Sequence, residues 1–508
     1  MITTSIHKFV NIELLKKYIQ TDIQPSSKLL IQVFFNNSDE NYIKTIQQTL
    51  NHMLPDAHII GTTTDGSIHN AQEDINATVI SFTCFEKSDL RHKLFQLEAN
   101  QEYKTARDIC ETLVCPNTKV IILFTEGLQF NIELLIKEIH TIAPNIILAG
   151  GLAGDNAQFT KTVVCDNIET STQGIVAVSI NSDSLFVHND YNLSWESIGK
   201  SMFVTKCKNN VVYELDGVNP IQQYQNFLGS HTLKKYQHDF IPTVGIEFPF
   251  IIKRDDFPIA RAALGRDGKS ITFAGSFKEG DKLHFSFTNI EKIIESGVLL
   301  SKRLQYKPVE TIFVYSCMAR RRFMKENIVH DLKPLIKIAP VSGFYTYGEI
   351  YSTSNTKEFL NHTMTILALS EEDELFTHKV DNIQVKNDNL ETLNMLTKLL
   401  KVSSKEAKEE NILKIANDLF WNDIDKELVY QEKKIPLTKS ETLLIDLLIQ
   451  NINTSIDSYT IFTYIWKEKE FNQNSIRTLI KKIRKKLPTD IIQNSYGGFY
   501  RLDRLSSN

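Results

Sequence analysis

The sequence predicts a mixed α/β region with internal duplication over residues 1–372, followed by a helical connector and a smaller α+β domain. Three observations lead to this fold class. A strand–helix–strand–glycine pattern occurs three times in the first region, and a charged stretch without Gly or Pro follows it. The chain then ends in short strands, three helices and a Gly-Gly hairpin. A length of 508 residues suits about three domains of roughly 150 residues.

The composition is that of a globular protein, with 42% apolar residues, 23% charged residues and a formal net charge of -4. Disordered, collagen-like and coiled-coil classes are excluded for the bulk of the chain. The six cysteines form no CxxC pair and no Cys/His spacing typical of zinc, so we expect a reducing compartment, no metal and no cofactor. Without a signal-peptide pattern or a run of ~18 apolar residues, we expect a cytoplasmic protein with no membrane partner.

The three repeated segments each comprise an apolar strand, a helix of about three turns and a second strand. They are Leu29–Phe35, Asn41–Met53 and His58–Gly61; Val120–Phe124, Ile132–Ile142 and Ile146–Ala149; and Thr311–Tyr315, Phe323–Ile338 and Pro340–Ser342. Units of this length predict parallel neighbouring strands. Between the second and third segments, Asp267-Gly268 predicts an antiparallel hairpin.

Each second strand is expected to open into a glycine loop, reading GTTTDG (61–66), GGLAGD (150–155) or GFYTYGE (343–349). Ligands collect at the carboxyl ends of strands in open α/β sheets, and glycine lets backbone N–H groups approach an anion. The loops could therefore converge on one small, partly anionic ligand. None fits a phosphate-binding fingerprint, and any one of them could equally serve only as a tight turn.

A second candidate site is the sequence YSCMARRR, residues 315–322. A cysteine beside three arginines could be a thiolate of lowered pKa, and the arginines could bind a carboxylate through paired hydrogen bonds. A catalytic role for Cys317 would also need a base, and the nearby sequence offers no histidine. We therefore expect no catalytic residue.

These segments, together with VVYELDGVNPIQQYQNFLG (211–229), KEGD (278–281) and FLNHTMTILAL (359–369), resemble the FIST sensory domain in the family's order. The resemblance implies a signal-transduction module in two halves, residues 1–200 and 201–372, that senses small molecules such as amino acids. It assigns ligand binding to Gly150, Gly151, Gly154, Asp155, Cys317, Arg320, Gly343, Gly348 and Glu349. Arg320 and loop N–H groups would bind a carboxylate, and Glu349 or Asp155 an ammonium group. The first loop departs from the family's usual GxSTxGE form.

The connector, residues 373–415, is expected to be helical. Over the stretch 387–420, leucines and isoleucines recur at three- and four-residue spacing on a charged background, which favours a packed amphipathic helix pair. Ser403-Ser404 interrupts the apolar seam, so a long coiled coil is disfavoured. A role in dimerisation or signal relay is a hypothesis.

The last domain, residues 416–508, is expected to hold three helices. Thr438 precedes an apolar run and predicts a helix start, and further helices are predicted at Ser458–Lys467 and Asn474–Leu487. On the third helix Ile476, Leu479, Ile480, Ile483 and Leu487 form one apolar stripe, opposite a basic face. Residues 473–488 contain six basic and no acidic residues, as expected for a helix that lies in a DNA groove.

From LTKSE (437–441) through SIRTLIKKIRKKL (475–487) to YGGFYRL (496–502), this domain resembles the winged helix of OmpR/PhoB-type response regulators. The resemblance implies that the third helix enters the major groove and that the hairpin forms the wing. The implied DNA-binding residues are Asn474, Arg477, Thr478, Lys481, Lys482, Lys485, Tyr496 and Arg501, with Lys486 a further backbone contact. No receiver domain precedes this region.

The combined expectation is a one-component transcription regulator, in which a small molecule such as an amino acid controls binding to double-stranded DNA. A homodimer is expected, with RNA polymerase as a candidate further partner. Two alternatives stay open. One is an enzyme that acts on an amino-acid-like substrate through Cys317 and Arg320, and the other is a protein-interaction scaffold that binds no DNA.

Overall fold

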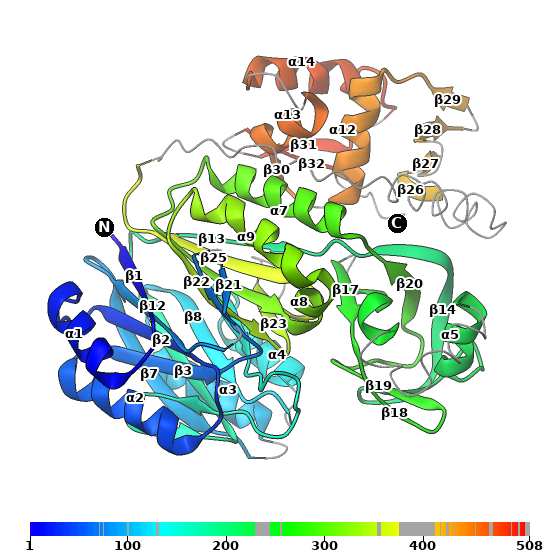
Figure 1. Cartoon of the computed structure of the whole chain (residues 1–508). Helices are drawn as coiled ribbons and strands as arrows, with labels where there is room; N and C mark the ends of the chain where they lie inside the picture. Colours follow the sequence, from blue (N-terminus) through cyan, green and yellow to red (C-terminus); the bar gives the residue numbers. More distant parts are fainter. Residues whose placement is uncertain are drawn as a thin grey trace. The chain divides into compact units, whose positions relative to one another are not determined.

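The computed structural model describes residues 1–70, 72–74, 76–98, 101–128, 132–228, 244–254, 257–352, 357–374, 412–416, 418–422, 426–431, 433–452, 454–466, 471–488, 490–495 and 498–502. The chain divides into two compact units (Figure 1). Unit 1 comprises residues 1–197 and 201–386, and unit 2 comprises residues 198–200 and 387–508. Within the described ranges, no helix has both the length and the hydropathy that a membrane span requires.

Unit 1 contains three copies of one chain path: edge strand, helix, strand, helix, strand, short hairpin and long strand. The first copy is β1 (Thr3–Lys8), α1 (Ile12–Asp22), β2 (Leu29–Phe35), α2 (Glu40–Met53), β3 (His58–Thr63), β4 (Ser67–His69), β5 (Gln72–Asp74) and β6 (Val79–Cys84). The second is β7 (Asp89–Gln96), α3 (Glu102–Leu113), β8 (Thr118–Thr125), α4 (Ile132–Ile142), β9 (Ile147–Leu152), β10 (Val164–Cys165), β11 (Thr170–Ser171) and β12 (Gly174–Asn181).

The third copy has two helices in place of its second helix. It is β13 (Phe186–Asn192), α7 (Ile290–Leu304), β21 (Thr311–Cys317), α8 (Met318–Met324), α9 (Ile328–Ile336), β22 (Val341–Thr346), β23 (Glu349–Ser352), β24 (Lys357–Leu360) and β25 (Met364–Ser370). The duplication expected from the sequence thus extends to three copies. The single helix expected over 323–338 is wrong, because Lys325 adopts a positive φ of 51° and ends α8.

The copies interlock, because the short hairpin of each copy joins the sheet of another. The three six-stranded sheets have the orders β1-β6-β2-β3-β10-β11, β24-β23-β9-β8-β12-β7 and β13-β25-β21-β22-β4-β5. Each sheet contains one parallel pair, β2–β3, β8–β9 or β21–β22, which confirms the parallel pairing predicted from the repeated segments. The remaining neighbours in these sheets pair antiparallel.

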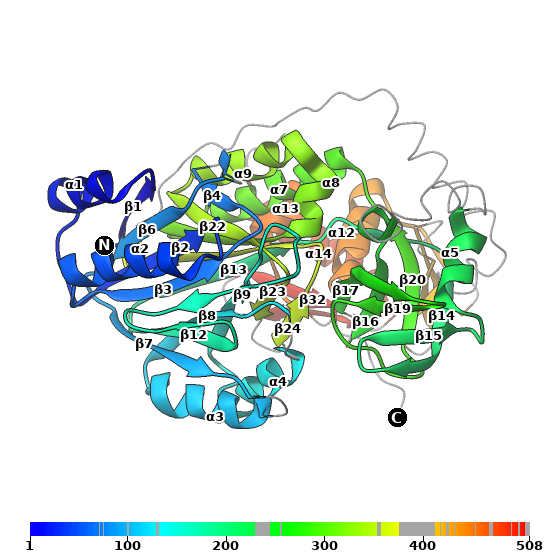
Figure 2. The ribbon, with the colours of Figure 1, turned by 60° about the horizontal axis from the view of Figure 1, so that its bottom comes forward.

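The sheets enclose a shared aromatic core, and helices cover their outer faces (Figure 2). Phe34, Phe124 and Tyr315 occupy matching places in the first strand of each parallel pair. The ring centroids of Phe34 and Phe124 are 6.1 Å apart, and those of Phe124 and Tyr315 are 5.9 Å apart. Burial of these large rings supplies much of the free energy that holds the three copies together.

The three glycine segments are crossovers that contact one another. Backbone hydrogen bonds link each segment to both of the others, among them those from Asp65 N to Tyr345 O, from Leu152 N to Gly348 O and from Gly154 N to Thr63 O, each 2.9 Å long. Gly150 and Gly151 lie inside β9 and Gly343 inside β22, so the expectation that the loops begin at these glycines is wrong. The N–H groups of Asp65, Leu152 and Gly154 serve the junction and are not presented to an anion.

The third copy carries an insertion between β13 and α7. It consists of β14 (Glu196–Lys208), β15 (Val211–Leu215), α5 (Pro220–Leu228), β16 (Phe250–Arg254), β17 (Phe257–Arg261), β18 (Ala263–Asp267), β19 (Ser270–Phe273) and β20 (Lys282–Phe287). Its strands form a seven-stranded sheet in the order β17-β16-β20-β14-β15-β19-β18. The predicted Asp267-Gly268 hairpin is confirmed as the β18–β19 turn.

Unit 2 contains a four-stranded sheet, three helices and a hairpin. Its elements are β26 (Ile412–Ala416), β27 (Leu419–Asn422), β28 (Glu427–Tyr430), β29 (Lys433–Ile435), α12 (Lys439–Gln450), β30 (Ile456–Asp457), α13 (Ser458–Trp466), α14 (Gln473–Arg484), β31 (Ile492–Ser495) and β32 (Phe499–Leu502). Thr438 and Glu441 form a capping box at the start of α12, as the sequence predicts for a helix there.

Most of the expected connector, residues 375–411, lies outside the described residues. Where the structure resumes, the helical expectation is wrong, because residues 412–416 form β26 and pair antiparallel with β27. Ile415 is fully buried in the core of unit 2 through this strand. The expected dimerising role of the connector stays a prediction.

The close approach of β9 to β8 predicts that Gly150→Ala destabilises unit 1. Gly150 has a φ of +124°, and a Cβ there would lie 2.0 Å from the carbonyl oxygen of Leu123. Strain and collision together should cost about 2–4 kcal/mol, measured as a lower thermal midpoint of the full chain. Gly217→Ala is the matched control, since its φ is +72° but nothing lies within 4 Å of the added Cβ. Equal losses for the two variants would contradict the role of the contact.

Candidate functional site

Helix α14 presents an exposed basic face over a buried apolar stripe. The Asn472 side chain caps its start by accepting hydrogen bonds from the N–H groups of Asn474 (2.9 Å) and Ser475 (3.3 Å). The stripe that anchors the helix consists of the buried residues Ile476, Leu479, Ile480 and Ile483. The predicted contacts Asn474, Arg477, Thr478, Lys481, Lys482 and Lys485 are all exposed.

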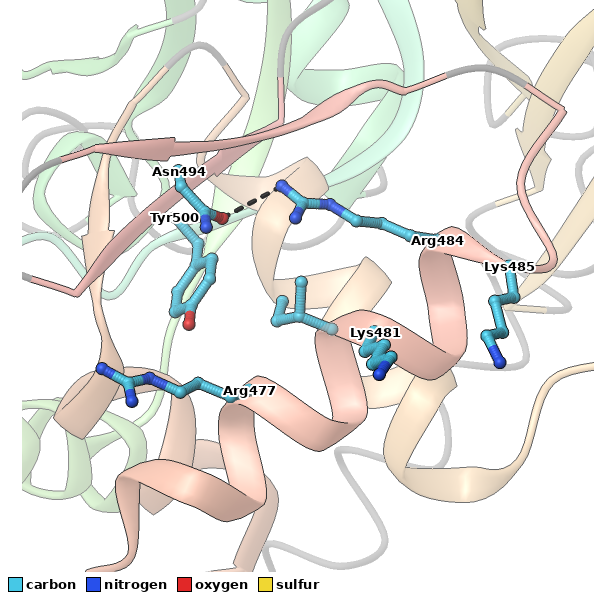
Figure 3. Close-up of a pocket in the computed structure, with 7 residues that line it drawn as sticks. Arg477, Lys481, Arg484, Lys485, Asn494 and Tyr500 are labelled. Carbon is cyan, nitrogen blue, oxygen red and sulfur yellow. Dashed lines mark hydrogen bonds between the residues drawn. The ribbon is translucent and has the colours of Figure 1, made fainter.

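The predicted DNA-binding residues of α14 line hollows on both sides of the helix. Arg477, Lys481 and Lys485 line the hollow between α14 and the β31–β32 hairpin, together with Asn494 and Tyr500 (Figure 3). Asn474, Thr478 and Lys482 line a second hollow, beside the start of α12 and Trp466. An exposed helix of this kind fits the width of a DNA major groove, and its cations favour phosphate contacts.

Arg484 fixes the hairpin beside α14. Its Nη2 donates to Oδ1 of Asn494 at 3.0 Å and to the carbonyl oxygen of Ile492, and its Nε lies 3.4 Å from a carboxylate oxygen of Asp490. Lys486 also has a structural role, because its Nζ donates to Glu441 at 2.7 Å and to the carbonyl oxygen of Pro436 at 2.9 Å. These partners direct Lys486 toward the fold, whereas the sequence suggested a contact to the DNA backbone.

The hairpin residues are only partly described. Tyr496 lies outside the described residues, and Arg501 is half-buried in β32. Asn494 and Tyr500, which the sequence reasoning missed, face the basic hollow. The sequence offers little indication of this position. Side chains in a short hairpin alternate between its two faces, but the pattern does not show which face lies against a helix and which faces solvent.

In unit 1, the three arginines at 320–322 all pair with carboxylates of the protein. Arg320 and Asp331 are both fully buried, and Nε and Nη2 of Arg320 lie 3.0 and 2.8 Å from Oδ2 of Asp331. Arg321 and Arg322 share Asp65, at 2.7 and 3.1 Å. Asp331 and Asp65 thus occupy the guanidinium edges that the sequence offered to a ligand carboxylate.

Asp155 organises its own loop. Its carboxylate accepts hydrogen bonds from the backbone N–H groups of Phe159 (2.8 Å), Thr160 (2.7 Å) and Lys161 (3.0 Å), and from the hydroxyl of Tyr347. Burial alone would raise the pKa of Asp155, but these hydrogen bonds outweigh it and the pKa is lowered. The carboxylate is therefore satisfied within the protein.

Cys317 and Glu349 are fully buried neighbours. Burial, and after it the nearby Glu349 carboxyl, raises the pKa of the Cys317 thiol. The low-pKa thiolate considered from the sequence is therefore wrong, which removes the main support for a nucleophilic enzyme. Burial also raises the pKa of Glu349 well above its usual value, although Thr363 donates a hydrogen bond to its carboxyl group.

A cavity of about 620 Å³ lies in unit 1. Its walls come from the second copy, the inserted sheet and the third copy. Of the nine residues predicted to bind ligand, Cys317 lines this cavity and the other eight do not. The nine residues are thus not gathered at one open site, and their ligand-binding role stays a prediction. Phe359 and Asn361, which line the cavity, belong to the FLNHTMTILAL motif, to which the sequence gave no chemical role.

Unit 2 has the order of elements of a winged-helix DNA-binding domain, and unit 1 is a separate α/β domain with a cavity. Three family models match the chain: "FIST N domain" over residues 29–218, "FIST C domain" over residues 220–352, and "Transcriptional regulatory protein, C terminal" over residues 432–502. The chain is a signal-sensing transcription regulator. It consists of a two-part FIST sensory domain and an OmpR/PhoB-type winged helix.

Three solved structures resemble the carboxy-terminal part. The DNA binding domain of CpxR from E. coli is 20% identical, with 19% of this chain and 98% of that chain covered and a TM-score of 0.17. The response regulator DrrB, a Thermotoga maritima OmpR/PhoB homologue, is 18% identical over 24% of this chain and 55% of its own, with a TM-score of 0.18. A streptococcal protein from a family of redox sensors, which evolved from two-component response regulators, is 17% identical over 22% and 53%, with a TM-score of 0.17.

The match spans about half the length of the latter two proteins. These TM-scores are low, so the winged-helix assignment depends on the family model and on the order of elements in unit 2. No curated protein matches the chain.

The buried pair predicts that Arg320→Met lowers the free energy of unfolding by about 3–5 kcal/mol, because it leaves the Asp331 carboxyl buried without its partner. The double variant Arg320→Met/Asp331→Leu should recover most of the loss, since it removes both charges. Thermal and urea unfolding of the full chain measures both effects. A double variant no more stable than Arg320→Met would contradict this account.

The raised pKa of Glu349 predicts a pH effect of defined sign. The folded chain holds this proton more tightly than the unfolded chain, so the stability from Glu349 is present below its unfolded pKa of 4.5 and is lost as pH rises through the folded pKa. Glu349→Gln should therefore gain stability relative to the wild type between about pH 5 and pH 8. Parallel thermal melts at each pH measure the difference, and a constant difference across this range would refute the assignment.

Proposed function

We propose that the protein is a one-component transcription regulator in the cytoplasm, in which a small molecule bound by the FIST domain controls the affinity of the winged helix for DNA. The observation that carries the proposal is the exposed basic face of α14, which lies over a buried apolar stripe beside the hairpin. Such a face attracts a polyanion, because its binding to DNA phosphates releases counterions from the nucleic acid.

DNA binding by this face would be strongly salt dependent. Six basic residues lie between 473 and 488, with no acidic residue among them. Arg484 and Lys486 already bond within the protein, so if each of the other four neutralises roughly one phosphate, the logarithm of the affinity should fall with the logarithm of salt concentration at a slope of about -3.6. A homodimer would occupy tandem half-sites about 10–11 bp apart, and RNA polymerase is the candidate further partner.

Regulation requires the ligand to bind one state of the protein better than the other. A ligand of equal affinity for the DNA-binding and the inactive state shifts nothing, however tightly it binds. The cavity of unit 1 supports small-molecule binding, because its volume lies in the range of known ligand sites.

Lys481→Ala/Lys485→Ala should weaken binding to every duplex and make the salt slope less negative by about 2, because two phosphate contacts are lost. Mobility-shift titrations of the full chain at several salt concentrations measure both quantities. Lys433→Ala, an exposed lysine on β29 outside both hollows, is the matched control and should leave the slope unchanged. Unaltered binding by the double variant would contradict the role of α14, and no binding of duplex DNA by the wild type at low salt would favour the scaffold alternative.

A further inference from the structure

The cavity in unit 1 contains a buried amide without a protein partner. Asn361 is fully buried and lines the cavity, and neither Nδ2 nor Oδ1 has a hydrogen-bond partner among the described residues. Asn210, also on the lining, donates from Nδ2 to the carbonyl oxygen of Phe273 at 2.9 Å. Buried polar groups are nearly always hydrogen-bonded, so an orphaned amide at a cavity wall indicates a partner that the protein does not supply.

Gly348 keeps this wall open. A Cβ at position 348 would lie 2.2 Å from the ring of Phe359 and 3.2 Å from Nδ2 of Asn361. A side chain at 348 would therefore displace both groups from the cavity wall. This contact gives a physical reason for a glycine that the sequence placed in the ligand-binding set, although Gly348 does not itself line the cavity.

The cavity offers no free charge to a ligand. Among the described lining residues there is no Lys, Arg, His or Asp, and the one carboxylate is Glu133. Glu133 already accepts hydrogen bonds from Arg254 (3.1 Å), from Arg261 and from the backbone N–H of Ser276 (2.8 Å). Burial raises the pKa values of Cys317 and Tyr347, so both are neutral. A carboxylate held against the buried Asn361 amide would lose water without gaining a paired cation, which is costly.

The remaining lining favours a flat apolar body. Phe159 and Tyr347 stack with ring centroids 4.7 Å apart and an interplanar angle of 27°. Both rings line the cavity, and so do Phe273, Phe359, Leu152 and Met318. Aromatic walls with a few placed polar groups are typical of sites for small planar molecules.

We propose that this cavity binds an uncharged planar small molecule whose edge carries a hydrogen-bond donor beside an acceptor, as in a carboxamide, a lactam or a purine. Asn361 recognises that edge, because its amide presents one donor and one acceptor to match. The aromatic rings of the lining pack against the apolar body of the molecule. This proposal rests on the proposed sensing function and names its ligand class, which differs from the amino acid implied by the family resemblance.

Matched fragment pairs test the charge and the edge separately. The full chain is titrated with benzamide against benzoate, and with nicotinamide against nicotinate, in a thermal-shift assay confirmed by calorimetry. At about tenfold above its dissociation constant, an amide should raise the melting temperature by roughly 2 °C, and its carboxylate partner should not. Asn361→Ala should abolish the shift, whereas Asn226→Ala, on α5 outside the cavity lining, should retain it.

A second variant guards against loss of folding. Should Asn361→Ala fail to fold, Ala274→Leu fills the cavity from the inserted segment and should block the amides in the same way. Any of three results overturns the proposal. The amide and its carboxylate partner bind equally, amide binding survives both variants, or neither amide binds up to its solubility limit.

DNA mobility shifts are measured in parallel. Loss of DNA binding with intact amide binding would defeat the regulator function and leave the ligand assignment standing.

Discussion

Unit 1 depends on a closed ring of backbone hydrogen bonds among three crossover segments. Each crossover carries the chain from its own sheet into another copy's sheet, and each is bonded to both of the others. Backbone groups buried at such a junction must find partners, and the other crossovers supply several of them. This requirement explains why the segments are rich in glycine: at Gly150 a side chain would collide with the neighbouring strand.

The same ring decides where a ligand can bind. The crossovers use N–H groups among themselves, and the arginines of the third copy pair with Asp65 and Asp331, so the junction has little left to offer an anion. The inserted sheet of the third copy, in contrast, encloses a cavity with an unpaired amide against the second copy. Glu133 of α4 ties the two walls together through Arg254, Arg261 and Ser276. Because the junction and the inserted sheet are separate parts of unit 1, changes in the insertion could alter the ligand that binds without disturbing the junction.

The sequence predicted what depends on neighbouring residues along the chain. The parallel pairs, the β18–β19 hairpin and the buried stripe of α14 follow from local periodicity and turn chemistry, and all are confirmed. It did not reveal the exchange of hairpins between sheets, because that pairing joins segments far apart in the chain. The ion-pair partners of the three arginines could not be predicted for the same reason, since Asp65 lies 256 residues from Arg321. In the sequence alone, the three arginines therefore resembled a vacant anion site. Asn361 could not be identified from the sequence, because whether an amide has a hydrogen-bond partner depends on the residues that surround it in the fold.

A ligand held by Asn361 would act at the start of β25, and the chain leaves the described part of unit 1 from the opposite end of that strand. Asn361 lies between β24 and β25, and β25 ends one residue before Glu371. The Glu371 carboxylate accepts hydrogen bonds from the backbone N–H groups of Glu86, Lys87 and Ser88, which fixes this end of the strand to the turn between β6 and β7. A tenfold change in DNA affinity needs a difference of about 1.4 kcal/mol in ligand binding between two states. A hydrogen bond or two at Asn361, made in one state and lost in the other, is enough to supply it.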